Sequence, residues 1–214
     1  FQKIVAGVNA TLDTVVDKTV WYEAIIDAVP FPIHVIDMDM NWTMLNKAFE
    51  KLMVDNKVVA DRKAAVGMPC SSAAANICNS DKCGIRQLQK GIGESFFDWC
   101  GSQCKQDTSY LFNKKGEKIG YVEVVTDLTP ILRNRDYTHC EIERMAGNLN
   151  KLSAGNLELD LQVNEADEHT AATRADFVKI NESLALVKDA VGAMIADAEM
   201  LVNEAIAGRL DTRA

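Results

Sequence analysis

The sequence predicts an α+β domain built on a five-stranded antiparallel sheet with short helices, set between long amphipathic helices. Three observations predict it. Apolar residues recur at spacings of three and four in both terminal segments, which is the period of a helix. Between residues 33 and 126 the pattern changes to short extended runs bounded by turn residues. After Thr129, apolar residues follow a strict four–three alternation, which is typical of a coiled-coil seam.

The chain is expected to open inside a helix, because its first apolar residues share one helical stripe. That stripe consists of Phe1, Ile4, Val8, Leu12 and Val15. A second, short amphipathic piece from Trp21 to Val29 ends at Pro30 and Pro32, since proline cannot continue a helix.

Alternating side chains then predict a hairpin, with strands at residues 33–37 and 42–45 and a turn at residues 39–41. Asn46 is a suitable N-cap for the helix that follows it. After a cysteine-containing region and a short helix at residues 84–90, three more extended runs cover residues 94–99, 108–113 and 118–126. Gly116 makes the connection between the last two a good hairpin turn.

Thr129 as N-cap and Pro130 as the first helical residue predict a helix after the sheet. Its seam consists of Ile142, Met145, Leu149 and Leu152. An irregular connector runs from about residue 154 to Thr173. A second seam follows it, formed by Phe177, Ile180, Leu184, Val187, Val191 and Met194. Two seamed helices joined by a connector of this length predict a parallel pair whose seams require a partner chain.

An internal repeat links the two ends of the chain. Residues 1–4, Val8 and Asp13 match residues 177–180, Leu184 and Asp189, and residues 154–157 match residues 207–210. Both ends are therefore expected to continue in a longer protein.

Residues 31–129 resemble a PAS domain. Residues 31–39 and 46–50 resemble its opening hairpin and first helix, and residues 113–129 resemble its last hairpin and its D-x-T exit, here Asp127 and Thr129. Residues 130–200 resemble a HAMP domain, with Gly155 and Leu157 matching its G-x-L element, and residues 1–16 resemble the end of a preceding HAMP domain.

The arrangement is similar to the cytoplasmic sensory region of a methyl-accepting chemotaxis protein. The resemblance implies four segments: residues 1–20 as the end of a HAMP helix and linker, 21–129 as the sensor, 130–200 as the relay and 201–214 as the start of a further repeat. It also implies a parallel homodimer with a four-helix bundle, joined to the rest of a receptor and its downstream kinase complex. Asp127, Thr129, Gly155 and Leu157 would couple sensor and relay.

Composition narrows the function classes. With 23 basic and 31 acidic residues, the chain has a net charge of −8 and no basic patch with interleaved aromatic residues, so nucleic-acid binding is disfavoured. No segment is apolar enough for a membrane span and no signal peptide is present, so we expect a cytoplasmic protein or the cytoplasmic part of a membrane-anchored receptor.

Five of the six cysteines cluster in the sequence: Cys70, Cys78, Cys83, Cys100 and Cys104. Thiolates bind zinc, iron and iron–sulfur clusters, and close pairs can form disulfides, so these residues are the candidate cofactor site. The alternative is that several are small buried apolar side chains. Neither a zinc-ribbon nor a ferredoxin spacing is present, and Cys140 lies off the seam.

Haem and flavin are disfavoured as cofactors. The chain has no C-x-x-C-H motif and no histidine between Leu45 and Asn113, and the context of Cys78 differs from that of a photoactive flavin site. His34 is predicted to be a satisfied core or edge residue. Phe96, Phe97, Trp99 and Tyr110 are predicted to be core residues or the lining of a small-molecule pocket.

No catalytic triad and no phosphate-binding loop can be assembled from the sequence, which favours a non-enzymatic protein. The predicted function is a signal-transduction module of a chemoreceptor that senses a ligand or redox state and relays it through dimeric helices. The alternatives are a cysteine-ligated metal or iron–sulfur redox protein and a structural spacer between relay units.

Overall fold

The computed structural model describes residues 2–209, with the side chains of Gln2 and Ala6 excepted. Predictions that involve Phe1 and residues 210–214 lie outside the described residues. The chain divides into two compact units, Phe1–Thr129 and Pro130–Ala214. Within the described residues, no helix combines the length and apolar character that a membrane crossing requires.

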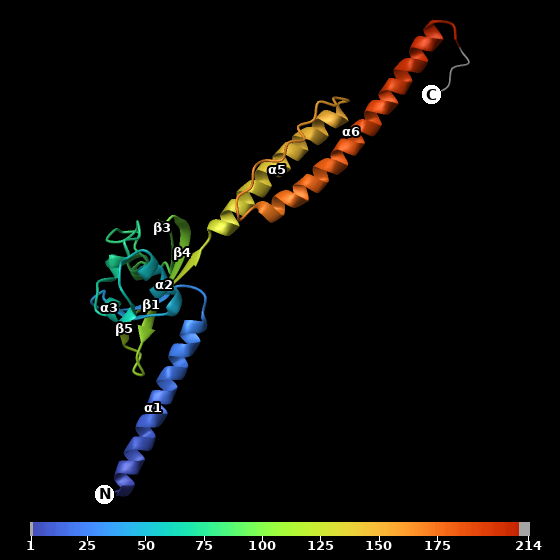
Figure 1. The fold of residues 1–214 in the computed structure, drawn as a ribbon. Helices are drawn as coiled ribbons and strands as arrows, with labels where there is room; N and C mark the ends of the chain where they lie inside the picture. Colours follow the sequence, from blue (N-terminus) through green and yellow to red (C-terminus); the bar gives the residue numbers. More distant parts are fainter. Residues whose placement is uncertain (1, 210–214) are drawn as a thin grey trace. The chain divides into compact units, whose positions relative to one another are not determined.

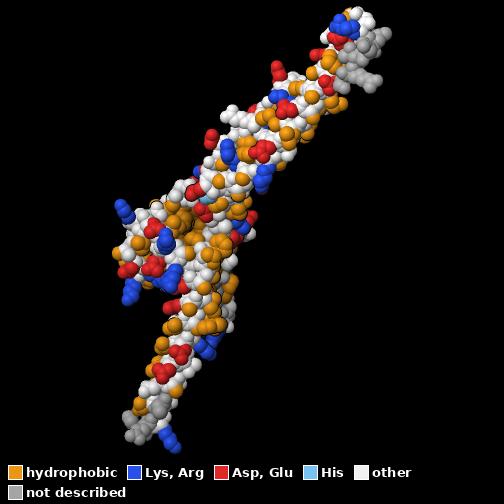
Figure 2. Space-filling view, turned by 45° about the vertical axis from the view of Figure 1, so that its right-hand side comes forward, with side chains coloured by type: hydrophobic (Ala, Val, Ile, Leu, Met, Phe, Trp, Pro, Cys, Tyr) orange, Lys and Arg blue, Asp and Glu red, His pale blue; other side chains and the backbone are white. Residues whose placement is uncertain are grey.

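The first element is one long helix, α1 (Gln2–Ala28), where the sequence analysis expected two separate pieces. No proline lies before Pro30, so nothing in the sequence forces the backbone to leave the helix. α1 exposes much of its apolar surface, as the hydrophobic side chains along it in Figure 2 show.

The five predicted strands form one antiparallel sheet in the order β2-β1-β5-β4-β3 (Figure 1). The strands are β1 (Ile33–Asp37), β2 (Trp42–Leu45), β3 (Glu94–Trp99), β4 (Ser102–Phe112) and β5 (Lys118–Asp127). This sheet and its short helices confirm the predicted α+β architecture.

Strand β4 begins at Ser102, six residues before the predicted start, which corrects the sequence analysis. The reason is a two-residue turn at Cys100 and Gly101, which have φ values of 51° and 83°. Positive φ at both positions suits a tight hairpin turn, so β4 pairs with β3 from Trp99 and Ser102 onward.

Short helices pack against the inner face of the sheet: α2 (Lys47–Asp55), α3 (Arg62–Ala65), the 3₁₀ helix η1 (Cys70–Ala73) and α4 (Gly84–Gln89). The core includes Ile36, Trp42 and Leu45 from the hairpin and Phe49 and Met53 from α2. Aromatic rings meet near its centre, with the Trp42 and Phe49 centroids 5.6 Å apart.

Asn46 joins three segments of the first unit. Its Oδ1 accepts the Phe49 N–H at 2.9 Å, which confirms the predicted N-cap of α2. Its Nδ2 donates to the carbonyl oxygens of Val29 and Phe31 at 3.2 and 2.8 Å. Because Asn46 is fully buried, the chain that leaves α1 is fixed to the start of α2.

The second unit contains α5 (Thr129–Ser153), apart from its first residue, followed by a connector and α6 (Ala171–Ile206). Thr173 donates to Asn134 at 2.8 Å and Arg144 donates to Asn181 at 3.1 Å. Both contacts advance along the two helices in the same direction, so the predicted parallel pair is confirmed (Figure 1). The connector, predicted to be irregular, directs every second side chain inward, namely Leu157, Leu159, Leu161 and Val163.

Buried polar groups hold this connector in place. The Glu141 carboxylate, 0% exposed, accepts the Asn164 N–H at 2.9 Å and Arg144 Nη2 at 2.6 Å. Burial alone raises the pKa of Glu141, but these hydrogen bonds and the Arg144 charge together hold the pKa below its ordinary value. Glu141 therefore fixes the connector to α5 as a buried anion.

Candidate functional site

A small inner cavity of about 40 Å³ lies between the sheet and the segment that carries η1 and α4. Its walls include His34, Gln106 and Glu123 from three strands and Cys70, Cys78 and Cys83 from the facing segment. A cavity of this volume holds a few water-sized molecules.

The sheet side of the cavity carries a buried polar network. His34 Nε2 lies 2.7 Å from Glu123 Oε2, and the Thr108 hydroxyl lies 3.2 Å from Glu123 Oε1. Gln106 Nε2 donates to Glu123 and, at 3.2 Å, to Thr108. All four side chains are buried. Within the described part of the chain, His34 Nδ1 is buried and has no hydrogen-bond partner, although the residue itself lines the cavity.

Gly84, the first residue of α4, sits directly on this network. A Cβ at that position would meet the side chains of Gln106 and Thr108 and lie 2.9 Å from Glu123 Oε1. Only glycine lets α4 approach the sheet this closely.

The facing wall contributes three of the predicted cysteines. Burial, then the nearby Glu123 carboxylate and the Cys83 and Cys78 thiols, raise the pKa of Cys70 to about 12. Burial also raises the pKa of Cys78. At neutral pH these two groups are protonated, and a protonated thiol is a poor nucleophile and a poor metal ligand.

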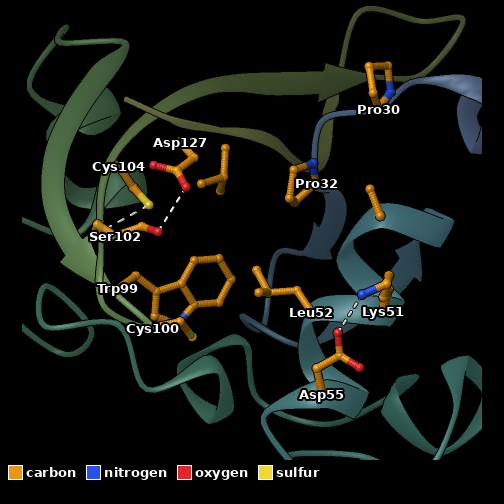
Figure 3. A pocket seen from close by; sticks show the side chains of 12 residues that line it. Pro30, Pro32, Lys51, Leu52, Asp55, Trp99, Cys100, Ser102, Cys104 and Asp127 are labelled. Carbon is orange, nitrogen blue, oxygen red and sulfur yellow. Dashed lines mark hydrogen bonds and ion pairs between the residues drawn. The ribbon is translucent and has the colours of Figure 1, made fainter. Parts of the chain in front are cut away.

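The other two cysteines of the cluster line a separate outer pocket of about 340 Å³. It lies between α2 and the end of the sheet where β3 turns into β4, with Trp99 and Leu52 facing each other across it (Figure 3). Burial, followed by the Asp127 carboxylate, raises the pKa of Cys104 to about 11. Trp99 and Val125 line both this outer pocket and the inner cavity.

The predicted cysteine site is therefore divided into two groups. Cys70, Cys78 and Cys83 surround the inner cavity, and Cys100 and Cys104 lie at the outer pocket. All six cysteines, including the exposed Cys140, are free thiols. Among the residues that the structure describes, no three His, Cys, Asp or Glu side chains are arranged to hold a metal ion.

The sheet ends in a hydrogen-bonded junction that contains Asp127 and Thr129. Asp127 accepts the Ser102 hydroxyl and the Thr129 N–H, each at 2.8 Å. Gln103 donates its N–H to the Thr129 hydroxyl at 2.8 Å and accepts the Leu128 N–H at 2.8 Å. Helix α5 begins at Thr129 itself, one residue before the predicted start. The exit of β5 is thus fixed to the beginning of β4.

Gly155 and Leu157 lie in the second unit, where α5 ends. Gly155 has a φ of +76°, and Asn156 donates to the Lys151 carbonyl at 2.9 Å, a common way to terminate a helix. Gly208 ends α6 in the same way, with a φ of +78° and a bond from Arg209 to the Glu204 carbonyl. Leu157 points inward, toward Gly192 on α6.

Other predictions for single residues are corrected by the structure. His34 is a buried core residue, but only one of its ring nitrogens is satisfied. Phe97 and Trp99 are buried, whereas Phe96 is 62% exposed because it lies on the outer face of β3. The sequence analysis missed Gln106, Thr108 and Glu123. Each lies an even number of positions from other buried residues of its strand, so its side chain points to the same face of the sheet. This alternation is the feature of the sequence from which the three residues could have been predicted to face the core.

No protein-family model and no curated protein matches the chain. Among solved structures, the chain is similar to a PAS domain from Colwellia psychrerythraea (14% identity, TM-score 0.38), covering 54% of this chain and 98% of that chain. It is also similar to a PAS domain of an HTR-like protein from Haloarcula marismortui (12%, TM-score 0.40, coverage 56% and 98%). A third is the VqmA–ligand–DNA complex of Vibrio cholera (12%, TM-score 0.38, coverage 50% and 50%). At identities and TM-scores this low, nothing that these proteins bind or do carries over to this chain.

Proposed function

We propose that residues 21–129 form a PAS-type sensor and that the chain is a non-enzymatic signalling module. The inner cavity is the observation that carries the proposal. It combines a buried carboxylate, an imidazole with one nitrogen that has no partner among the described residues, and three thiols, so a small occupant would meet several hydrogen-bonding groups there. Such a site can distinguish two states without performing catalysis.

The signal would leave the sensor through the junction of Asp127 and Thr129 with the start of β4. Trp99, the last residue of β3, pairs with Ser102, the first residue of β4. Ser102 in turn donates its hydroxyl to Asp127. A displacement of the cavity wall at Trp99 therefore reaches Asp127 through the paired strands. From Asp127, a change between two helix packings whose free energies differ by a few kcal/mol is enough to transmit this displacement.

The relay would be a HAMP-like helical pair that works as a parallel homodimer. Seam residues on both helices of the second unit stay exposed, including Ile142 and Leu149 on α5 and Val187 and Met194 on α6. Their four–three spacing fits a seam closed by the same helices of a second copy.

Helix α1 also supports a parallel homodimer. Val5, Val8, Leu12, Val15, Tyr22 and Ile26 follow one heptad seam, with Thr19 as its polar member. In this register Lys18 occupies a g position and Glu23 the following e position. In a parallel, in-register pair, the g residue of one chain meets the e residue of the other, so Lys18 would face Glu23 with opposite charge.

The receptor context is proposed as well. Repeated helical units and a central sensor fit the cytoplasmic region of a chemoreceptor that controls a kinase complex, as expected from the resemblance. The test is the response of the parent receptor after Cys70, Cys78 and Cys83 are all replaced by serine, with Cys140→Ser as the matched control. A changed response with intact folding supports the inner cavity as the sensor. A response equal to that of the control contradicts it and favours a structural spacer.

A further inference from the structure

The outer pocket has the size and lining of a second ligand site, distinct from the inner cavity. Its volume of about 340 Å³ lies at the lower end of the range typical of small-molecule sites, roughly 300 to 1,000 Å³. Trp99 and Leu52 form two facing parts of its wall (Figure 3), and Pro30, Pro32 and Val125 extend the apolar lining.

The charged groups of the rim are paired with their neighbours. Lys51 Nζ lies 2.7 Å from Asp55 Oδ2, one turn along α2. Asp127 Oδ2 accepts the Ser102 hydroxyl at 2.8 Å. A charged ligand would have to lose hydration in an apolar pocket whose ionic groups already have partners, which is unfavourable. An uncharged ligand meets no such cost.

Trp99 gives the pocket a rigid aromatic wall. Its Nε1 donates to the Ala73 carbonyl at 2.7 Å, so the indole is held against η1. Only 6% of Trp99 is exposed, because Phe49 and Phe97 pack against it with ring centroids 5.8 and 6.3 Å away. The indole therefore offers the pocket a small apolar surface that is fixed in place.

We propose that the outer pocket binds an uncharged, mainly apolar small molecule that packs between Trp99 and Leu52. Because Trp99 also lines the inner cavity, and because Pro32 and Asp127 lie in the same pocket, this ligand contacts the entrance and the exit of the sensor at once. The site goes beyond the proposed function and does not depend on what occupies the inner cavity.

The first test compares three probes that share one ring system but differ in charge: indole, tryptamine and indole-3-acetate. Isothermal titration calorimetry with the full chain should show that indole binds at least tenfold more tightly than either charged probe. Absence of indole binding at millimolar concentration, or equal affinity for a charged probe, would overturn the proposal.

Two variants locate the binding. Ala48→Leu adds volume inside the pocket and should weaken indole binding at least tenfold, whereas Val54→Leu, on the same helix but outside the pocket, should leave it unchanged. Unchanged affinity in folded Ala48→Leu protein would overturn the site. If that variant does not fold, indole should still slow modification of Cys100 by a maleimide in a Cys140→Ser background. No protection of Cys100 would overturn the site in that case.

Discussion

His34 on β1 and Glu123 on β5 are direct partners across the sheet, and their side chains meet at 2.7 Å with 6% of each exposed. They lie 89 residues apart in the sequence. Around them Gln106 and Thr108 complete the hydrogen bonds of the carboxylate. The inner cavity is thus built on a polar group that the fold encloses almost completely.

Glu123→Ala should destabilise the first unit by about 3 kcal/mol, because it removes the buried acceptor that His34, Gln106 and Thr108 share. Chemical denaturation followed by circular dichroism measures the loss. Glu117→Ala, in the exposed β4–β5 turn, is the control and should cost less than about 1 kcal/mol. If both variants lost the same free energy of unfolding, the buried hydrogen bonds of Glu123 would not stabilise the first unit.

Gly84→Ala should cost about 1 to 3 kcal/mol, because the added methyl group forces α4 away from Gln106 and Glu123. Gly7→Ala is the matched control. It lies in α1, where an added methyl group would have no heavy atom within 4 Å, and alanine favours a helix by up to about 1 kcal/mol. Thermal unfolding compares them, and a Gly84→Ala protein as stable as the Gly7→Ala protein would contradict the close packing of α4.

Because the pKa of the Cys70 thiol is raised, we expect the protein to lose stability in alkaline solution. Its pKa is raised from 9.0 in the unfolded chain to about 12 in the folded protein, so the unfolded state releases its proton first as the pH rises. The protonated Cys70 thiol contributes fully to the free energy of unfolding below pH 9.0. This contribution is lost between pH 9.0 and about 12, by at most about 1.4 kcal/mol per pH unit. Because Cys70 is only partly buried, solvent screening makes the actual loss smaller than this limit.

Denaturation curves at a series of pH values test this expectation. Cys70→Ala should flatten the alkaline fall in stability, while Cys140→Ala, at an exposed position, should leave its slope unchanged. The same slope in Cys70→Ala and in the unchanged chain would contradict the role given to Cys70.

The α1 seam predicts a specific charge pair between two copies. Lys18→Glu should weaken dimerisation about threefold to tenfold, because it places two carboxylates against each other, the new one and that of Glu23 in the second chain. The double variant Lys18→Glu/Glu23→Lys should restore it. Sedimentation equilibrium measures the dissociation constants, and a double variant no tighter than the single one would rule out the parallel register.

Strand positions were predictable where apolar alternation and turn residues agree, as at Ile33–Asp37 and Lys118–Asp127. The start of β4 was placed too late, although Gly101 indicated a strand turn, because the turn also uses Cys100 at a positive φ that asparagine or glycine usually takes. The grouping of the cysteines was beyond the sequence too. It depends on which loop packs over the sheet, and spacing along the chain carries no such information.

Asp127, at the end of β5, is proposed to couple the sensor to the helices that follow it, and Asp127→Ala in the parent receptor tests this coupling most directly. The variant loses the bonds to Ser102 and to the Thr129 N–H while the core of the sensor remains intact. We predict normal folding by circular dichroism and loss of the stimulus response, with Asp39→Ala in the exposed β1–β2 turn responding normally. An Asp127→Ala receptor that responds like the unchanged protein would contradict the account.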